Sequence, residues 1–115
     1  MYMTINEYQK AAMRTVSGVA GATKENQLIN GAMGLCGESG EFMDLLKKHM
    51  FHGHEIDKEH MAKELGDIAW YLATTADALG YNLETIMQMN VDKLLARYPD
   101  GFSVERSLNR GTGDV

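Results

Sequence analysis

Cysteine and proline are scarce in this chain of 115 residues, which has one of each, Cys36 and Pro99. A single cysteine excludes an intramolecular disulfide, so we expect a reducing, cytosolic compartment. Long hydrophobic runs are also missing: none approaches the roughly 20 residues of a membrane span, and the N-terminus lacks a signal-peptide pattern. The formal net charge of −5 argues against a nucleic-acid binder, because such proteins normally present a basic face.

The scarcity of proline leaves long stretches free for helix, and no segment shows the period-two alternation of a half-buried strand. We predict an all-α fold in which four main helices form a bundle. One domain would span 1–115, with a core over about 4–98 and an irregular tail over 99–115. Capping residues and breakers predict helices from Thr4, with Glu7 completing a capping box, to the segment 17–21; from about Thr23 to about Met50; from Asp57 to Gly80; and from Asn82 to Arg97 or Tyr98.

Glycine recurs at every third position of the second predicted helix, at Gly31, Gly34, Gly37 and Gly40. Each glycine in a helix interior costs about 1 kcal/mol relative to alanine. We expect a compensating reason, of which the close approach of another helix or of a ligand is the simplest. The alternative is a kink or a break in the helix at this point.

Two pairs of carboxylates follow the same spacing: Glu38 and Glu41, then Glu64 and Asp67. The i, i+3 spacing places both acids of a pair on one helix face, and at about 100° per residue each pair lies at the edge of an apolar stripe. Acids that serve only solubility belong on the opposite face. Carboxylates that converge between two helices repel one another unless cations neutralise them, and Mg²⁺ is the natural choice for oxygen ligands. A solvated helix edge is the simpler alternative.

Cationic and amide side chains supply the other half of a phosphate site. Lys48 lies beyond Glu41 on the same side of its helix, and Asn90, Lys93 and Arg97 form a polar stripe on the fourth predicted helix. The lysines and the arginine are suited to phosphate oxygens, and Asn90 to a sugar hydroxyl or a carboxylate ligand. Taken singly, each of these residues would be interpreted as an ordinary solvent-exposed residue with no role in binding.

Four histidines in one short stretch offer a competing metal site, because imidazole suits Zn²⁺, Ni²⁺ or Cu²⁺. No HExxH helix supports that interpretation, and a polar segment between helices is the favoured one. Trp70 faces away from the acids, and we expect it to pack against another helix or a partner subunit, with stacking on a base as the alternative. The histidines are His49, His52, His54 and His60.

The acidic pattern resembles that of the MazG-like nucleoside triphosphate pyrophosphohydrolases, within the all-α NTP pyrophosphatase superfamily. The hallmark of that family is ExxE, a spacer and ExxD, which here is Glu38-x-x-Glu41, twenty-two residues, and Glu64-x-x-Asp67. The flanking segments GLCGESGE, ELGDIAWYLA and NVDKLLARYPDGF are similar too, so the resemblance covers roughly residues 24–102.

This resemblance implies hydrolysis of a (d)NTP to a (d)NMP and pyrophosphate, dependent on Mg²⁺ with Mn²⁺ as a substitute, by a homodimer or homotetramer. It implies that the four acids bind metal, that Glu38 or Glu41 positions the attacking water, and that Asn90, Lys93 and Arg97 contact substrate. The alternatives are a sister activity on the same fold, either a dUTP/dCTP-preferring or a phosphoribosyl-ATP pyrophosphohydrolase, and a non-enzymatic helical dimerisation module that binds cations. No nucleic-acid or membrane partner is expected.

Overall fold

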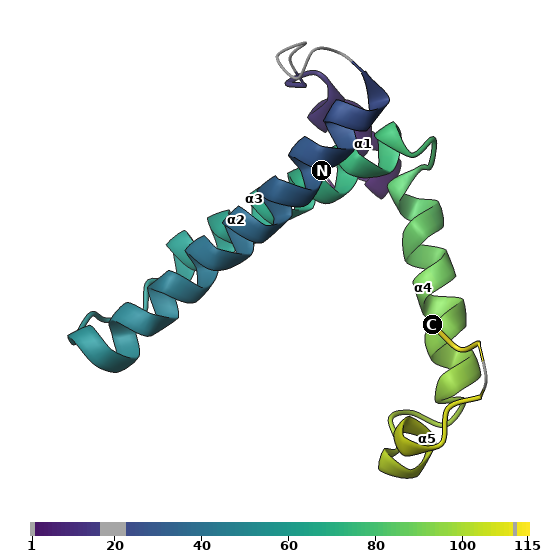
Figure 1. Cartoon of the computed structure of the whole chain (residues 1–115). Coiled ribbons are helices and arrows are strands. Elements are labelled where there is room, and N and C mark those ends of the chain that lie inside the picture. Colours follow the sequence, from purple (N-terminus) through teal and green to yellow (C-terminus); the bar gives the residue numbers. More distant parts are fainter. Residues whose placement is uncertain (1, 17–22, 112) are drawn as a thin grey trace. The chain divides into compact units, whose positions relative to one another are not determined.

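A computed structural model describes residues 2–16, 23–111 and 113–115 of the chain (Figure 1). Apart from an isolated bridge between Pro99 and Gly101, the regular structure in these ranges is helical, which confirms the all-α class. The chain divides into two compact units, Met1–Leu83 and Glu84–Val115, so a bundle containing all four main helices stays a prediction. The helices are α1 (Ile5–Met13), α2 (Lys24–His52), α3 (Lys58–Ala78), α4 (Leu83–Arg97) and α5 (Val104–Leu108).

The helix boundaries of the first unit follow from local capping chemistry. Thr4 and Glu7 form the predicted capping box of α1, and the hydroxyl of Thr23 accepts from the amide of Asn26 at the start of α2. Gly53 ends α2 in the left-handed region with φ of 73°, where a residue without Cβ has no steric penalty. The carboxylate of Asp57 then accepts from the amide of His60 and begins α3. The predicted caps Thr4 and Asp57 and the predicted start of α2 near Thr23 are thereby confirmed.

Two predictions about the ends of the chain need correction. The first helix ends at Met13, short of the predicted segment 17–21, because the Thr15 hydroxyl donates to the carbonyl of Ala12 and competes with helical bonding. Its predicted stop at 17–21 lies outside the described residues. The tail is not wholly irregular, since α5 forms within it behind the N-cap Ser103.

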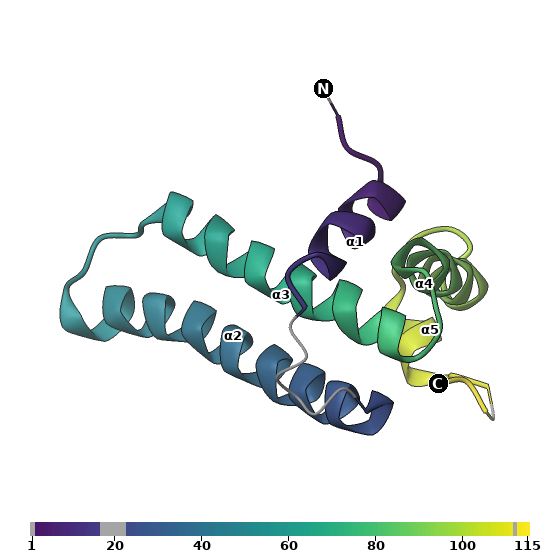
Figure 2. The same ribbon diagram turned by 90° about the horizontal axis from the view of Figure 1, so that it is seen from above.

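The core of the first unit is built from small side chains, most of them on α3. The glycine-bearing helix α2 runs antiparallel to α3 as a long hairpin, and α1 packs on α3 (Figure 2). The buried amide of Gln9 joins α1 to α3 and to the segment that follows α3. Its Nε2 donates to the carbonyls of Ala73 and Tyr81, and its Oε1 accepts from the amide of Leu83 at 2.9 Å. The buried hydrophobic residues are Ala12, Ala73, Ala76, Ala78 and Leu83.

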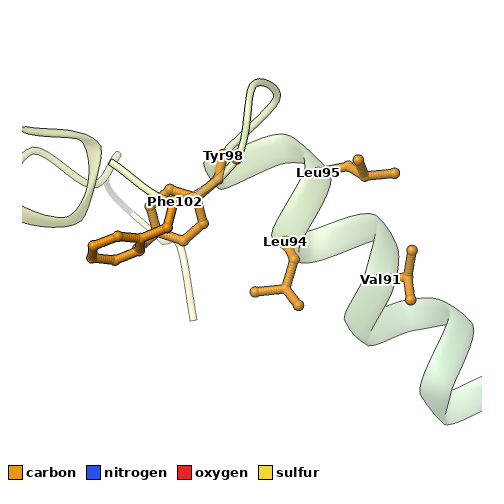
Figure 3. A pocket seen from close by; sticks show the side chains of 6 residues that line it. Val91, Leu94, Leu95, Tyr98 and Phe102 are labelled. Carbon is orange, nitrogen blue, oxygen red and sulfur yellow. The ribbon is translucent and has the colours of Figure 1, made fainter. Parts of the chain in front are cut away.

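Many large apolar side chains remain exposed in both units. In the second unit, α4 and the turn after it line an apolar pocket of about 390 Å³, with the rings of Tyr98 and Phe102 5.2 Å apart (Figure 3). In the first unit, α2 and α3 expose Ile29, Met33, Met43, Met50, Phe51, Leu65 and Leu72. Apolar surface of this extent is typical of a protein that associates with another chain.

Candidate metal centre

Two glycines determine how closely and in which register α2 and α3 pack. A Cβ at Gly31 would collide with the side chain of Thr75, and a Cβ at Gly34 would collide with the ring of Tyr71. We call Gly31 and Gly34 the glycine notch, since they accommodate α3. The notch explains two of the four recurring glycines, whereas nothing in the described residues lies within 4 Å of a Cβ at Gly37 or Gly40. The helix itself is continuous through all four.

The register set by the notch brings acids from the two helices together. In an antiparallel pair, one turn forward from Gly34 leads to Glu38, and one turn back from Tyr71 leads to Asp67. Carboxylate oxygens of Glu38, Glu64 and Asp67 lie within 4.8 Å of one another. These residues are called the acid trio below. Glu64 is the most enclosed member, with 13 % of its side chain exposed, while Asp67 is exposed.

The acid trio concentrates negative charge at one point of the hairpin. The pKa of Glu38 is raised, chiefly by its side-chain hydrogen bond with Glu64, then by desolvation and by the charges of Asp67, Glu64 and Glu41. The raised pKa of Glu38 follows from the closeness of the other carboxylates, which disfavours its ionised form. The donor set consists of oxygens alone, which fits a hard divalent cation such as Mg²⁺ or Mn²⁺.

The fourth predicted ligand, Glu41, does not join the trio. It is exposed, and its charge raises the pKa values of both Glu38 and Lys48 in part, so it lies on the flank of the trio toward Lys48. Lys48 itself is paired with Asp44 at 2.9 Å, and the hydrogen bond in this pair is the main reason its pKa is raised. A phosphate that binds Lys48 must therefore share it with Asp44.

The predicted polar stripe lies on α4, in the second unit. Arg97 donates from Nε to the Oδ1 of Asp114 at 2.6 Å, and only 11 % of its side chain is exposed. Asn90 is exposed and Lys93 is half-buried. Because the two units are described separately, a meeting of these residues with the acid trio stays a prediction.

Comparison with known proteins identifies the fold that carries these residues. The family model for the MazG nucleotide pyrophosphohydrolase domain matches residues 29–102. The chain belongs to the MazG family. The MazG match includes all four acids and the polar stripe of α4. The protein is also similar to the "Gene 37 protein" of Mycobacterium phage L5, with 31 % identity over 97 % of this chain and 98 % of the phage protein. No solved structure matched the chain.

The sequence pattern did not place Tyr8 or His60 beside the acid trio of this MazG domain. Tyr8 of α1 has a raised pKa, first because it is partly buried and then because of the charge of Asp67, which places it close to the trio. It is distant in sequence from the acids, so no local pattern indicates it. His60 forms a hydrogen bond with Glu64 at 3.2 Å, and the i, i+4 spacing of this pair could have indicated the contact.

The histidine stretch does not form a metal site of its own in the described part of the MazG chain. The only group of metal-binding side chains found there is the acid trio, and it contains no histidine. His49 lies on α2 with its Nδ1 2.7 Å from the carbonyl of His54, while His60 lies on α3. Trp70 donates from Nε1 to the hydroxyl of Thr15 at 2.7 Å, just after the end of α1, and its packing against another helix or a partner subunit stays a prediction. Among the described helices, none is both long and apolar enough to cross a lipid bilayer.

Proposed function

We propose that this protein is a Mg²⁺-dependent nucleoside triphosphate pyrophosphohydrolase that converts a (d)NTP to the (d)NMP and pyrophosphate. The observation that carries the proposal is the acid trio, in which two helices of a MazG domain bring three carboxylates within 4.8 Å. A polyanionic substrate would be repelled by this cluster in a chain of charge −5, so bound cations are needed to bring the two together. Bound Mg²⁺ supplies Lewis-acid activation of the phosphate.

The residues divide into three roles. The acid trio holds the cation, and Glu41 on its flank accepts a proton from the water that attacks phosphorus. The oxygen of that water bonds to phosphorus as the anhydride between the α- and β-phosphates breaks, and pyrophosphate leaves with the electron pair. Lys48, Lys93 and Arg97 offset the charge of the phosphate oxygens, and Asn90 binds the sugar or a carboxylate.

Homo-oligomerisation is part of the proposal. The buried hydrophobic residues in the described part of the chain are four alanines and Leu83, which is a thin core. Large side chains on the hairpin stay in solvent, among them Met33 at 69 % and Leu65 at 53 % exposed. Association of copies would bury these faces, as in helical bundles. Sedimentation that shows a stable monomer at micromolar concentration would contradict this part of the proposal.

The test of the activity is a panel of canonical and modified (d)NTPs incubated with Mg²⁺, with the nucleotide products and pyrophosphate quantified. We expect Glu41→Gln to lower kcat by about 10²–10⁴-fold, the usual contribution of a general base, while cation binding is retained. Asp67→Asn should weaken cation binding as well. Glu25→Gln, an exposed glutamate in the first turn of the same helix as Glu41, is the matched control and should behave as wild type.

The outcomes separate the proposed activity from its alternatives. Turnover confined to dUTP and dCTP, or to phosphoribosyl-ATP, would assign a sister activity on the same fold. A folded protein that binds Mg²⁺ and releases no pyrophosphate from any nucleotide would refute the enzymatic proposal. Turnover unaffected by both Glu41→Gln and Asp67→Asn would refute the assigned site.

A further inference from the structure

His60 contacts the most enclosed acid of the candidate metal centre. Its Nε2 lies 3.2 Å from the Oε1 of Glu64, one turn further along α3. An ionised carboxylate only accepts hydrogen bonds, so Nε2 must carry the proton and donate it to Glu64. The side chain of His60 is 50 % exposed and that of Glu64 is 13 % exposed, so the contact lies at the mouth of the site.

Glu64 therefore has neighbours on two sides. One is His60, and the other is Glu38, whose carboxylate lies within 4.8 Å of that of Glu64. The acids of the trio repel one another when ionised, so each tends to rotate away from the point where a cation would bind. A hydrogen-bond donor beyond the trio opposes that rotation, in the way that outer partners fix the carboxylate ligands of metal sites.

The surroundings of His60 favour a positioning role over direct metal binding. The group of side chains close enough to share an ion consists of the acid trio and excludes His60. On its other side, His60 lines a polar pocket of about 270 Å³ together with Lys48, His54 and Asp57. Its backbone amide is held by Asp57 at 3.0 Å, which fixes the residue in the first turn of α3.

We propose that His60 is a positioning residue for the cation site, and that its Nε2–H holds the Glu64 carboxylate so that an oxygen stays directed at Glu38 and Asp67. This inference rests on the proposed metal-dependent function but concerns cation binding, which can be measured without turnover. It predicts that the position of one donor atom controls cation affinity.

The experiment is a titration of the full-length protein with Mn²⁺, followed by electron paramagnetic resonance of free Mn²⁺ and by calorimetry with Mg²⁺. The two test variants are His60→Gln, whose amide nitrogen can occupy the place of Nε2, and His60→Asn, whose shorter amide cannot reach it. We expect His60→Asn to weaken Mn²⁺ affinity by about tenfold, the lower end for an outer-shell partner, because the contact is half exposed. His60→Gln should stay within about threefold of wild type.

Controls separate this role from general damage. His52→Gln changes an exposed histidine at the end of α2 and should leave affinity unchanged. Glu64→Gln removes the held carboxylate and should weaken binding at least as much as His60→Asn. The urea midpoints of both His60 variants should lie close to wild type, because an exposed i, i+4 pair adds little to stability.

Three results would overturn the inference. The first is binding of Mn²⁺ by His60→Asn as tight as in wild type, or tighter; tighter binding would show that His60 competes with the cation for Glu64. Equal losses in the Gln and Asn variants would show that the donor position is irrelevant. Wild-type protein that binds no Mn²⁺, even with a non-hydrolysable nucleotide analogue, would refute both this role and the metal site. A loss of affinity in His60→Asn without any pyrophosphate release would support His60 and refute the proposed enzyme.

Discussion

Substitution of Gly34 by alanine tests whether the glycine notch sets the spacing between α2 and α3. A Cβ at this position would overlap the ring of Tyr71, and the overlap involves the body of the ring and not its tip. The ring has little freedom to move away, because it packs edge-on against Trp70 with centroids 5.0 Å apart, and Trp70 is bonded to Thr15. Gly37, one turn further along the same helix, has open space around it and is the matched control.

The two substitutions should have opposite signs. Alanine at either position gains about 1 kcal/mol of helix propensity. At Gly34 the added methyl also overpacks the hairpin, which costs typically 1–3 kcal/mol and reaches the upper end here because ring atoms must shift. We therefore expect Gly34→Ala to lower the free energy of unfolding by about 1–2 kcal/mol, and Gly37→Ala to raise it by about 0.5–1 kcal/mol.

The assay is urea denaturation at matched protein concentration, since association shifts apparent stability. Mn²⁺ titration of the same proteins links the notch to the site: Glu38 and Asp67 are each one turn from the clash, so Gly34→Ala should weaken cation affinity and Gly37→Ala should not. If Gly34→Ala were as stable as Gly37→Ala and bound Mn²⁺ equally well, the notch would not control the hairpin.

Three further predictions concern other parts of the molecule. Gln9→Leu should lower the free energy of unfolding by about 2–4 kcal/mol in urea, because it leaves the Leu83 amide and two carbonyls without their partner, each worth about 1–3 kcal/mol; a loss below about 0.5 kcal/mol would contradict the account. The pKa of Glu38 in the folded protein lies above its ordinary value of 4.5, so its contribution to stability is present at lower pH and is lost as pH rises through the folded pKa. The Tm of the metal-free protein should therefore fall as pH rises above 4.5, and Glu38→Gln should flatten this dependence of Tm on pH. Added Mg²⁺ should restore the Tm at neutral pH. An identical pH dependence in Glu38→Gln would refute this assignment. Finally, Asp114→Asn should release Arg97 for phosphate and lower KM several-fold with little change in kcat, whereas a KM raised as in Arg97→Ala would show that Asp114 positions the arginine.

Local features of this protein followed from sequence because they depend on neighbours along the chain. The caps at Thr4 and Asp57 and the beginning of α2 near Thr23 depend on contacts within one turn, where hydrogen-bond geometry is fixed by residue type. The i, i+3 spacing of the acids places each pair on one helix face by the helical repeat alone. The MazG family could likewise be recognised from the order of the segments GLCGESGE, ELGDIAWYLA and NVDKLLARYPDGF along the chain.

Tertiary packing decided what the spacing could not. The register of α2 on α3 determines that Glu38 meets Glu64 and Asp67 while Glu41 stays on the flank, and this register depends on Tyr71 filling the space at Gly34. The periodic glycines looked equivalent in sequence, yet only two of them accommodate α3.

Contacts across large sequence separations were equally inaccessible to pattern reasoning. Tyr8 approaches Asp67, and Asp114 engages Arg97, through folding of segments that share no periodicity. The sequence by itself determined which chemical groups lie on each helix face, because local hydrogen bonding and helical repeat are short-range. The tertiary structure alone decided which of those groups meet, since that depends on the shapes of side chains brought together from distant parts of the chain.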